Sequence, residues 1–176
     1  MTGNTDCDGI TAYNYLSGEH ITEIKKGSPM YFRTPASNMN LANFMRAQIY
    51  SAFATLKLGM DILFENENVN AEIFRAHGGL FKVEGVAQQI LADALNVSVS
   101  VAENSGEGGA WGIALLSLYM MNSNGKPLGE WLSSEVFDKM NVLTLAPEPL
   151  GSEGFSKYIK QYQSGLTAEK KLDEIL

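Results

Sequence analysis

Residues 74–121 read FRAHGGLFKVEGVAQQILADALNVSVSVAENSGEGGAWGIALLSLYMM, and this stretch decides the fold. A strand is predicted over 71–76 and ends at the pair Gly78-Gly79. A helix is predicted over 84–95, a second strand over 97–101, and a glycine-rich turn then opens an apolar helix over 107–121. Two strands joined by a crossover helix are normally parallel. The stretch therefore predicts an α/β fold with a small, partly parallel sheet.

The glycine pair at the strand exit has two interpretations. Two positions without a Cβ let a backbone approach a flat ligand closely, such as the base or ribose of a nucleotide. A Gly-Gly pair is also common in an ordinary turn. Lys82 follows the pair and either reaches a phosphate or remains solvated.

The glycine-rich turn at 104–109, NSGEGG, is interpreted as a helix cap or as an anion loop at a helix N-terminus. It lacks the Lys-Ser/Thr ending of a P-loop, and the Glu107 carboxylate disfavours phosphate. The small residues Gly108 and Gly112, with Ala110 and Ala114, recur at a spacing of four. That spacing predicts tight packing of this helix in the core.

The flanking segments are less regular. Residues 1–36 predict a loop- and hairpin-rich opening, in which 10–15 pairs with 20–24 around Ser17-Gly18, followed by a short strand at 30–33. A helix over 41–64 is predicted from seven apolar residues spaced by three or four, namely Leu41, Met45, Ile49, Phe53, Leu56, Met60 and Leu63. Short helical turns are expected within 131–140. Phe155, Tyr158, Ile159 and Tyr162 predict a helix from about residue 152, and a separate tail helix is expected over 167–176.

Composition bounds the class of protein. The 176 residues are 45% hydrophobic and 19% charged, which is ordinary globular composition and predicts one domain over 1–176. The net charge of −7 excludes nonspecific binding to nucleic acid or to anionic lipid, which needs a basic face. No apolar run reaches the roughly 18 residues of a membrane span, so no membrane association is expected.

The residue inventory offers little catalytic chemistry. Cys7 is the single cysteine, which excludes an internal disulfide and a cysteine metal cluster and makes the cytosol the expected compartment. His20 and His77 are too few for a histidine metal site. Asp93, in the middle of a predicted helix, is interpreted as structural or as a surface residue. We predict no catalytic residue and no metal ligand in the chain.

Several of these segments together resemble the C-terminal lobe of FGGY carbohydrate kinases, most closely their ribulokinase- and xylulokinase-like branch. The resemblance covers nearly the whole chain and is strongest over 71–119. Its main motifs are Ala76-His77-Gly78-Gly79, the run QQILADAL from Gln88, the strand 97–101 and the run GGAWGIALL from Gly108. Weaker matches are Asn14-Tyr15, Ser17-Gly18-Glu19, the helix over 41–63, Gly154-Phe155, Tyr158 and Tyr162.

This resemblance implies a ribonuclease-H-like lobe of the actin, hexokinase and Hsp70 superfamily. It implies ATP or ADP with Mg²⁺ as cofactor and phosphorylation of a ketopentose-type sugar such as xylulose or ribulose. In the family the glycine pair packs on the adenosine, which maps onto Gly78 and Gly79. Many members carry Lys-Asn or a serine shortly after the pair, where this chain has Lys82 and Glu84. Those four residues are the expected nucleotide contacts.

The resemblance covers only the last third of a family member. The first phosphate loop, the catalytic base and most sugar contacts would lie in an N-terminal lobe outside this sequence, so we predict no turnover from this chain alone. Two alternatives are a non-catalytic nucleotide-binding module and an interaction lobe. The interaction lobe would pair with a partner lobe or with a second copy through 1–36 or the long helix.

Overall fold

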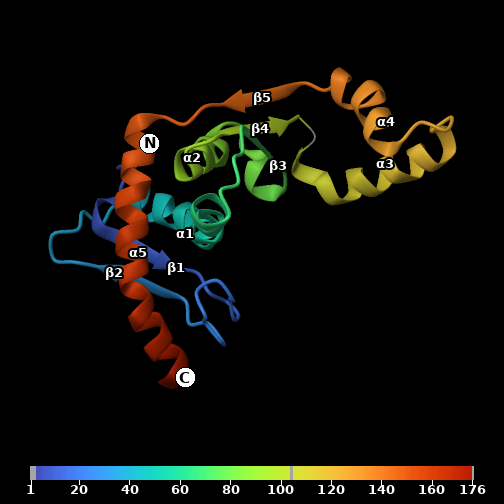
Figure 1. Ribbon diagram of the computed structural model, residues 1–176. Coiled ribbons are helices and arrows are strands. Elements are labelled where there is room, and N and C mark those ends of the chain that lie inside the picture. The colour runs from blue at the N-terminus through green and yellow to red at the C-terminus, as the bar shows by residue number, and fades with distance from the viewer. Residues whose placement is uncertain (1–2, 104, 176) are drawn as a thin grey trace.

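The computed structural model describes residues 3–103 and 105–175. A two-stranded sheet comes first, a three-stranded sheet follows, and helices α1, α2 and α5 pack around and between them (Figure 1). Helices α3 and α4 extend away from this body as an arm (Figure 1). The predicted helix-rich α/β fold with a small, partly parallel sheet is confirmed.

The first sheet pairs β1 (Ile10–Tyr13) with β2 (Met30–Arg33) in antiparallel fashion, Ile10 opposite Arg33. The predicted hairpin between 10–15 and 20–24 is therefore wrong, since the partner strand lies further along the chain. The carboxylate of Glu19 explains the difference. It accepts hydrogen bonds from the backbone N–H groups of Ile21 (3.1 Å) and Thr22 (2.9 Å), which holds this segment in a turn.

Helix α1 (Leu41–Asp61) begins where predicted, because the Asn40 side chain accepts a hydrogen bond from the Asn43 N–H at 2.9 Å. The helix passes into one turn of π-helix at Ile62–Asn66. Its buried face differs from the predicted stripe. Ala47, Tyr50 and Ala54 are fully buried, whereas Leu41, Met45, Leu56 and Leu63 are exposed. The small alanines let neighbouring elements approach this face, which hydrophobicity alone does not reveal.

The second sheet has the order β3-β4-β5. Strands β3 (Ile73–Ala76) and β4 (Ser98–Ala102) are parallel and are joined by α2 (Val86–Leu95), as predicted. Strand β5 (Val142–Leu145) runs antiparallel to β4 and was not predicted. It is a four-residue, largely exposed edge strand in a segment without clear periodicity, so local pattern gives little signal for it.

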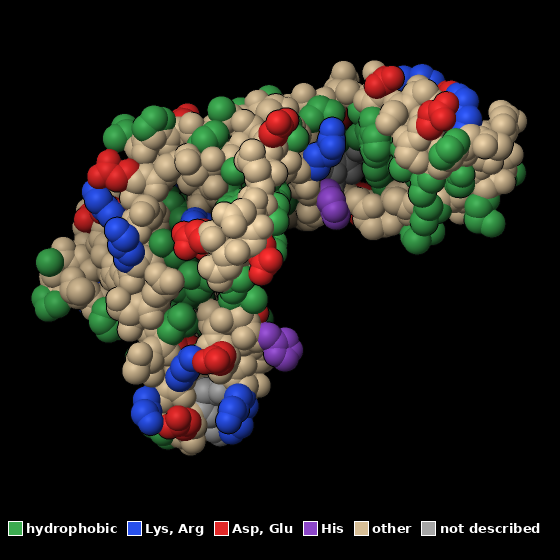
Figure 2. Space-filling view, viewed as in Figure 1, with side chains coloured by type: hydrophobic (Ala, Val, Ile, Leu, Met, Phe, Trp, Pro, Cys, Tyr) green, Lys and Arg blue, Asp and Glu red, His purple; other side chains and the backbone are tan. Residues whose placement is uncertain are grey.

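The arm consists of α3 (Gly108–Asn122) and α4 (Leu128–Glu135). Tyr119 and Trp131 hold it together, with ring centroids 5.6 Å apart in an edge-on contact. The described residues of α3 include none that is buried, and apolar side chains are visible along the arm in Figure 2. The predicted tight packing of α3 in the core is therefore wrong. No described atom lies within 4 Å of a Cβ built at Gly109 or Gly112. Small residues permit close approach, but they do not supply a neighbour.

Helix α5 (Pro149–Ile175) crosses the body as one continuous helix, where two were predicted. The helix continues through Gly165, where a Cβ would overlap the hydroxyl of Tyr13, so this glycine allows close packing without ending the helix. The predicted stripe is confirmed, because Phe155, Tyr158, Ile159 and Tyr162 are all buried.

The core around α5 is rich in buried tyrosines. The Tyr158 hydroxyl lies 3.4 Å from the Ala12 N–H and 3.3 Å from the Ala47 carbonyl oxygen, and so ties α5 to β1 and α1. The Tyr13 hydroxyl donates to the Tyr162 carbonyl at 2.8 Å. Burial raises the pKa of the Cys7 thiol to about 12, so this cysteine stays protonated at neutral pH.

Asp93 has a structural role, one of the two anticipated for it. Its carboxylate is buried near the end of α2 and accepts the Glu148 N–H at 2.7 Å and the Gln89 amide at 2.9 Å. A negative charge beside the first turn of α5 also suits the positive end of that helix. Asp93 thereby fixes the start of α5 against α2.

Candidate functional site

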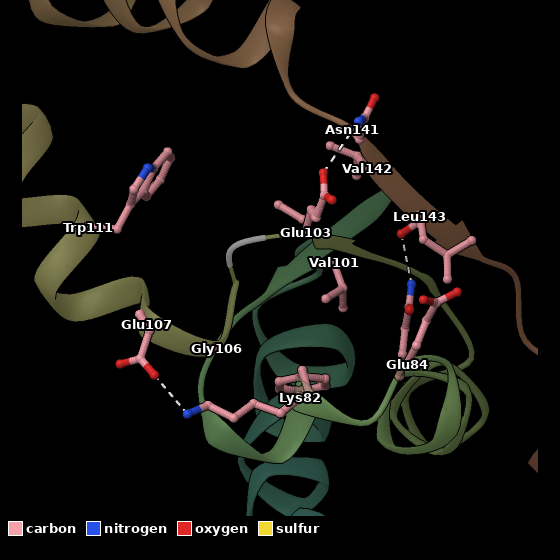
Figure 3. Close-up of a pocket in the computed structure, with 13 residues that line it drawn as sticks. Lys82, Glu84, Val101, Glu103, Gly106, Glu107, Trp111, Asn141, Val142 and Leu143 are labelled. Carbon is pink, nitrogen blue, oxygen red and sulfur yellow. Dashed lines mark hydrogen bonds and ion pairs between the residues drawn. The ribbon is translucent and has the colours of Figure 1, made fainter.

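A hollow of about 790 Å³ lies at the carboxyl ends of the parallel strands β3 and β4 (Figure 3). In α/β sheets this edge is where ligands bind, and the volume falls within the range of small-molecule sites. The wall of the hollow is built from α2, β4, β5, the start of α3, and the 3-10 turns η3 (Gly79–Lys82) and η4 (Ser105–Glu107). Its lining residues are Phe81, Lys82, Glu84, Gln88, Val101, Ala102, Glu103, Gly106, Glu107, Trp111, Asn141, Val142 and Leu143.

The glycine pair begins the turn that leads to the hollow. Gly78 has φ 118° and ψ 172°, a backbone conformation that favours glycine. No described atom lies within 4 Å of a Cβ built at Gly78 or at Gly79, so the surface above both is open. Neither glycine lines the hollow itself, since Phe81 is the first residue of this turn to do so.

Lys82 and Glu84, the other two expected contacts, do lie on the wall (Figure 3). Lys82 Nζ is 2.7 Å from Glu107 Oε1, an ion pair that joins η3 to η4. The hydrogen bond and the charge of Lys82 hold the pKa of the Glu107 carboxyl below its usual value. Both side chains are mostly exposed, at 58% and 74%, so the ion pair adds little to the stability of the fold. It does engage the positive charge of Lys82, which would otherwise be available to a ligand.

Two glycines allow η3 and η4 to meet. A Cβ at Gly106 would lie 2.9 Å from the Lys82 side chain, and one at Gly108 would lie 2.7 Å from His77 Nδ1. Both distances are shorter than normal contacts. Gly106 and Gly108 thus serve close packing at the border of the hollow, whereas Gly109 of the same run does not.

The far wall carries polar groups that sequence reasoning missed. Glu103 and Asn141 bond twice, because the Glu103 N–H donates to the Asn141 carbonyl and the Asn141 amide donates to Glu103 Oε2, both at 3.3 Å. The Gln88 amide donates to the Val99 and Leu143 carbonyls at 2.8 Å and so links β4 to β5. Asn141 and Leu143 reach the site at and beside β5, a strand that no local pattern predicted, so neither residue was selected from the sequence.

The charges of the wall bear on which ligand it can accept. The described lining carries one basic side chain, Lys82, and three carboxylates, those of Glu84, Glu103 and Glu107. A bare polyphosphate meets net repulsion here unless a cation accompanies it. Mg²⁺ bound with ATP usually keeps several waters and takes one or two carboxylates as ligands besides the phosphates. The three glutamates supply carboxylates of the type that such an ion binds. Across residues 3–103 and 105–175, no three His, Cys, Asp or Glu side chains form a preformed metal cluster.

No helix in the described part of the chain has the length and apolar character needed to cross a membrane.

Comparison with known proteins identifies the domain type. The model of the FGGY family of carbohydrate kinases, C-terminal domain, matches residues 1–121. Among solved structures, the chain resembles the xylulose kinase from Rhodospirillum rubrum (TM-score 0.71, 15% identity) over 98% of its own length and 33% of that chain. The gluconate kinase from Lactobacillus acidophilus gives a TM-score of 0.68 at 17% identity, over 97% of this chain and 34% of that one.

The Plasmodium falciparum glycerol kinase, solved with ADP, gives a TM-score of 0.66 at 14% identity over 94% of this chain and 31% of that one. At such identities the likeness concerns the fold. The chain spans about a third of the length of these kinases. No curated protein sequence matches it.

Proposed function

Because this chain belongs to the FGGY family of carbohydrate kinases, as its C-terminal domain, we propose that it is the nucleotide-binding part of an ATP-dependent sugar kinase. The observation that supports this most is the open hollow at the carboxyl ends of β3 and β4, together with two glycines without side-chain cover that precede Phe81 and Lys82 of its wall. The adenosine would lie against Gly78 and Gly79. Lys82 and Glu84 would face the phosphates and their Mg²⁺ at the rim.

Isothermal titration calorimetry with ADP tests this function. We expect saturable heat from the isolated chain, and no magnesium-dependent ADP release above a no-sugar blank with xylulose or ribulose. Turnover is not expected because most groups that surround the transferred phosphoryl in this reaction lie outside this sequence. A flat titration with both ADP and ATP would refute nucleotide binding by this lobe.

We also propose a ketopentose as the sugar of the whole kinase. The motifs of 71–119 support this, since they resemble the ribulokinase- and xylulokinase-like branch. Gluconate and glycerol kinases match the fold at similar TM-scores, so the fold does not distinguish among these sugars and the sugar is tested by itself. ADP release from the lobe combined with an N-terminal kinase lobe, measured with xylulose, ribulose, gluconate and glycerol, would answer it.

Removing the Glu107 carboxylate is expected to tighten ADP binding. Glu107→Gln frees Lys82 from its 2.7 Å ion pair and removes one negative charge beside the phosphates. We expect ADP affinity to rise by about three- to tenfold at low salt, an effect that 0.5 M salt should suppress. Adenosine, which has no phosphate, should bind as before.

Glu135→Gln is the matched control for this prediction. Glu135 forms comparable exposed ion pairs with Lys126 and Lys139, and its loss changes the net charge equally, but it lies on the arm away from the hollow. Equal gains in the two variants would mean that overall charge, and not Lys82, sets the affinity.

A second candidate function is self-association, supported by the exposed α3. Ile113 is 67% exposed and Met120 83%, yet no residue of this helix is charged. Two copies with a net charge of −7 each repel, and α3 adds no charge to that repulsion. Light scattering should then show dimers that Ile113→Glu disrupts. Leu150→Glu, at an equally exposed apolar site on α5, should leave them intact.

A further inference from the structure

The aromatic ring of Trp111 lines the hollow, and the proposed function gives it no role. Trp111 lies in the first turn of α3 and is half-buried, in contrast to the open apolar residues further along that helix. In Figure 3 its indole stands on the α3 side of the hollow, while Glu84 and Leu143 lie on the opposite side. Trp111 is therefore the only aromatic ring on the arm side of the described lining, and Phe81 is the other ring of that lining.

The surroundings of Trp111 suit a planar, largely apolar group. Val101 of β4 and Val142 and Leu143 of β5 line the same hollow and supply aliphatic surface. Trp111 ends the first turn of α3, four residues after Glu107, the last residue of η4. In Figure 3 the indole and the Glu107 carboxylate point to opposite sides of α3, so the indole stands apart from the Lys82–Glu107 ion pair.

We propose that Trp111 stacks on the nucleobase of the bound nucleotide, which places the base under the arm and leaves the ribose of the adenosine as the part that lies against Gly78 and Gly79. This inference rests on the proposed nucleotide-binding function and adds a wall that is supplied by α3. A purine is the flat part of ATP, and stacking on an aromatic ring is the contact by which proteins commonly hold it. The carboxylate and amide of the Glu103–Asn141 pair lie in the same lining and offer acceptors to the polar edge of the base.

The chain offers a matched pair of reporters, because its two tryptophans are Trp111 and Trp131. Trp131 is buried within the arm against Tyr119 and does not line this hollow. Adenosine, which carries the base without phosphates, is titrated into Trp131→Phe, where Trp111 reports, and into Trp111→Phe, where Trp131 reports. We expect adenosine to quench the emission of the first variant and to leave that of the second unchanged.

Affinity supplies the second measurement. Trp111→Ala should weaken adenosine binding about tenfold or more, whereas Trp111→Phe, which keeps a ring, should lose no more than about threefold. Circular dichroism checks that the variants are folded. If Trp111→Ala does not fold, the quenching of Trp111 emission in Trp131→Phe still tests the stacking. Inorganic triphosphate, which lacks a base, should bind Trp111→Ala and the unaltered chain equally.

The outcomes separate the two proposals. If the unaltered chain binds adenosine but Trp111 emission does not change and Trp111→Ala binds equally well, the stacking is refuted and the proposed function stands. If the unaltered chain binds neither adenosine nor ADP, both are refuted. Quenching of Trp131 in place of Trp111 would move the base out of this hollow and would also overturn the inference.

Discussion

Replacing Gly79 by valine is expected to abolish nucleotide binding while the protein stays folded. Gly79 lies at the start of η3 with open space above it, and a branched side chain there would occupy the surface on which the adenosine is proposed to lie. The substitution should be tolerated, because no described atom lies within 4 Å of its Cβ. We expect at least a ~100-fold loss of ADP affinity by calorimetry, about 2.7 kcal/mol.

The choice between the two glycines matters for this test. Gly78 has φ 118°, so a valine there would strain the backbone and confuse loss of binding with loss of structure. Gly129→Val provides the control, since it too has no described atom within 4 Å of its Cβ but lies in α4, outside the hollow. Unchanged ADP affinity in Gly79→Val would show that the glycine pair is not the nucleotide platform.

Replacing Gly154 by alanine is expected to destabilise the whole protein. Gly154 lies in α5 beside the buried Phe155, and a Cβ at this position would overlap the carbonyl oxygen of Thr5. That carbonyl is held in place, because it accepts a 2.7 Å hydrogen bond from the Tyr50 hydroxyl. Overpacking against fixed backbone costs about 1–3 kcal/mol. Urea unfolding followed by circular dichroism should show a loss of this size.

Gly129→Ala is the matched control for the packing prediction. It makes the same chemical change within a helix, and its Cβ meets no described atom within 4 Å. Alanine is the better helix former by up to about 1 kcal/mol, so this variant should be slightly more stable than the unaltered chain. If both variants shift the free energy of unfolding in the same direction, α5 does not depend on close approach at Gly154.

The elements that the sequence predicted well are those whose signals are local. The apolar spacing from Leu41 predicted α1, and the parallel pair β3 and β4 followed from a crossover helix between two short apolar runs. The buried stripe of α5 followed from Phe155, Tyr158, Ile159 and Tyr162. Each of these signals is carried by one continuous stretch of chain.

The errors share a different cause, since each depended on a partner distant in sequence. A separate tail helix was expected over 167–176, but α5 continues as one helix, in which Gly165 packs against Tyr13, 152 positions earlier in the chain. Gly108 and Gly112 suggested core packing, yet α3 projects from the body. The segment 20–24 was expected to pair with 10–15, but β1 pairs instead with β2, which lies further along the chain.

The candidate site divides in the same way. Gly78, Gly79, Lys82 and Glu84 form one continuous segment, so motif and resemblance were enough to select them. Glu103, Trp111 and Asn141 come from three further elements and gather around the hollow only when β4, α3 and β5 are in place. Composition, periodicity and capping fix which segments become helices and strands, because those preferences act between near neighbours. The tertiary structure decides which distant side chains share a cavity, because that depends on how the segments pack in space.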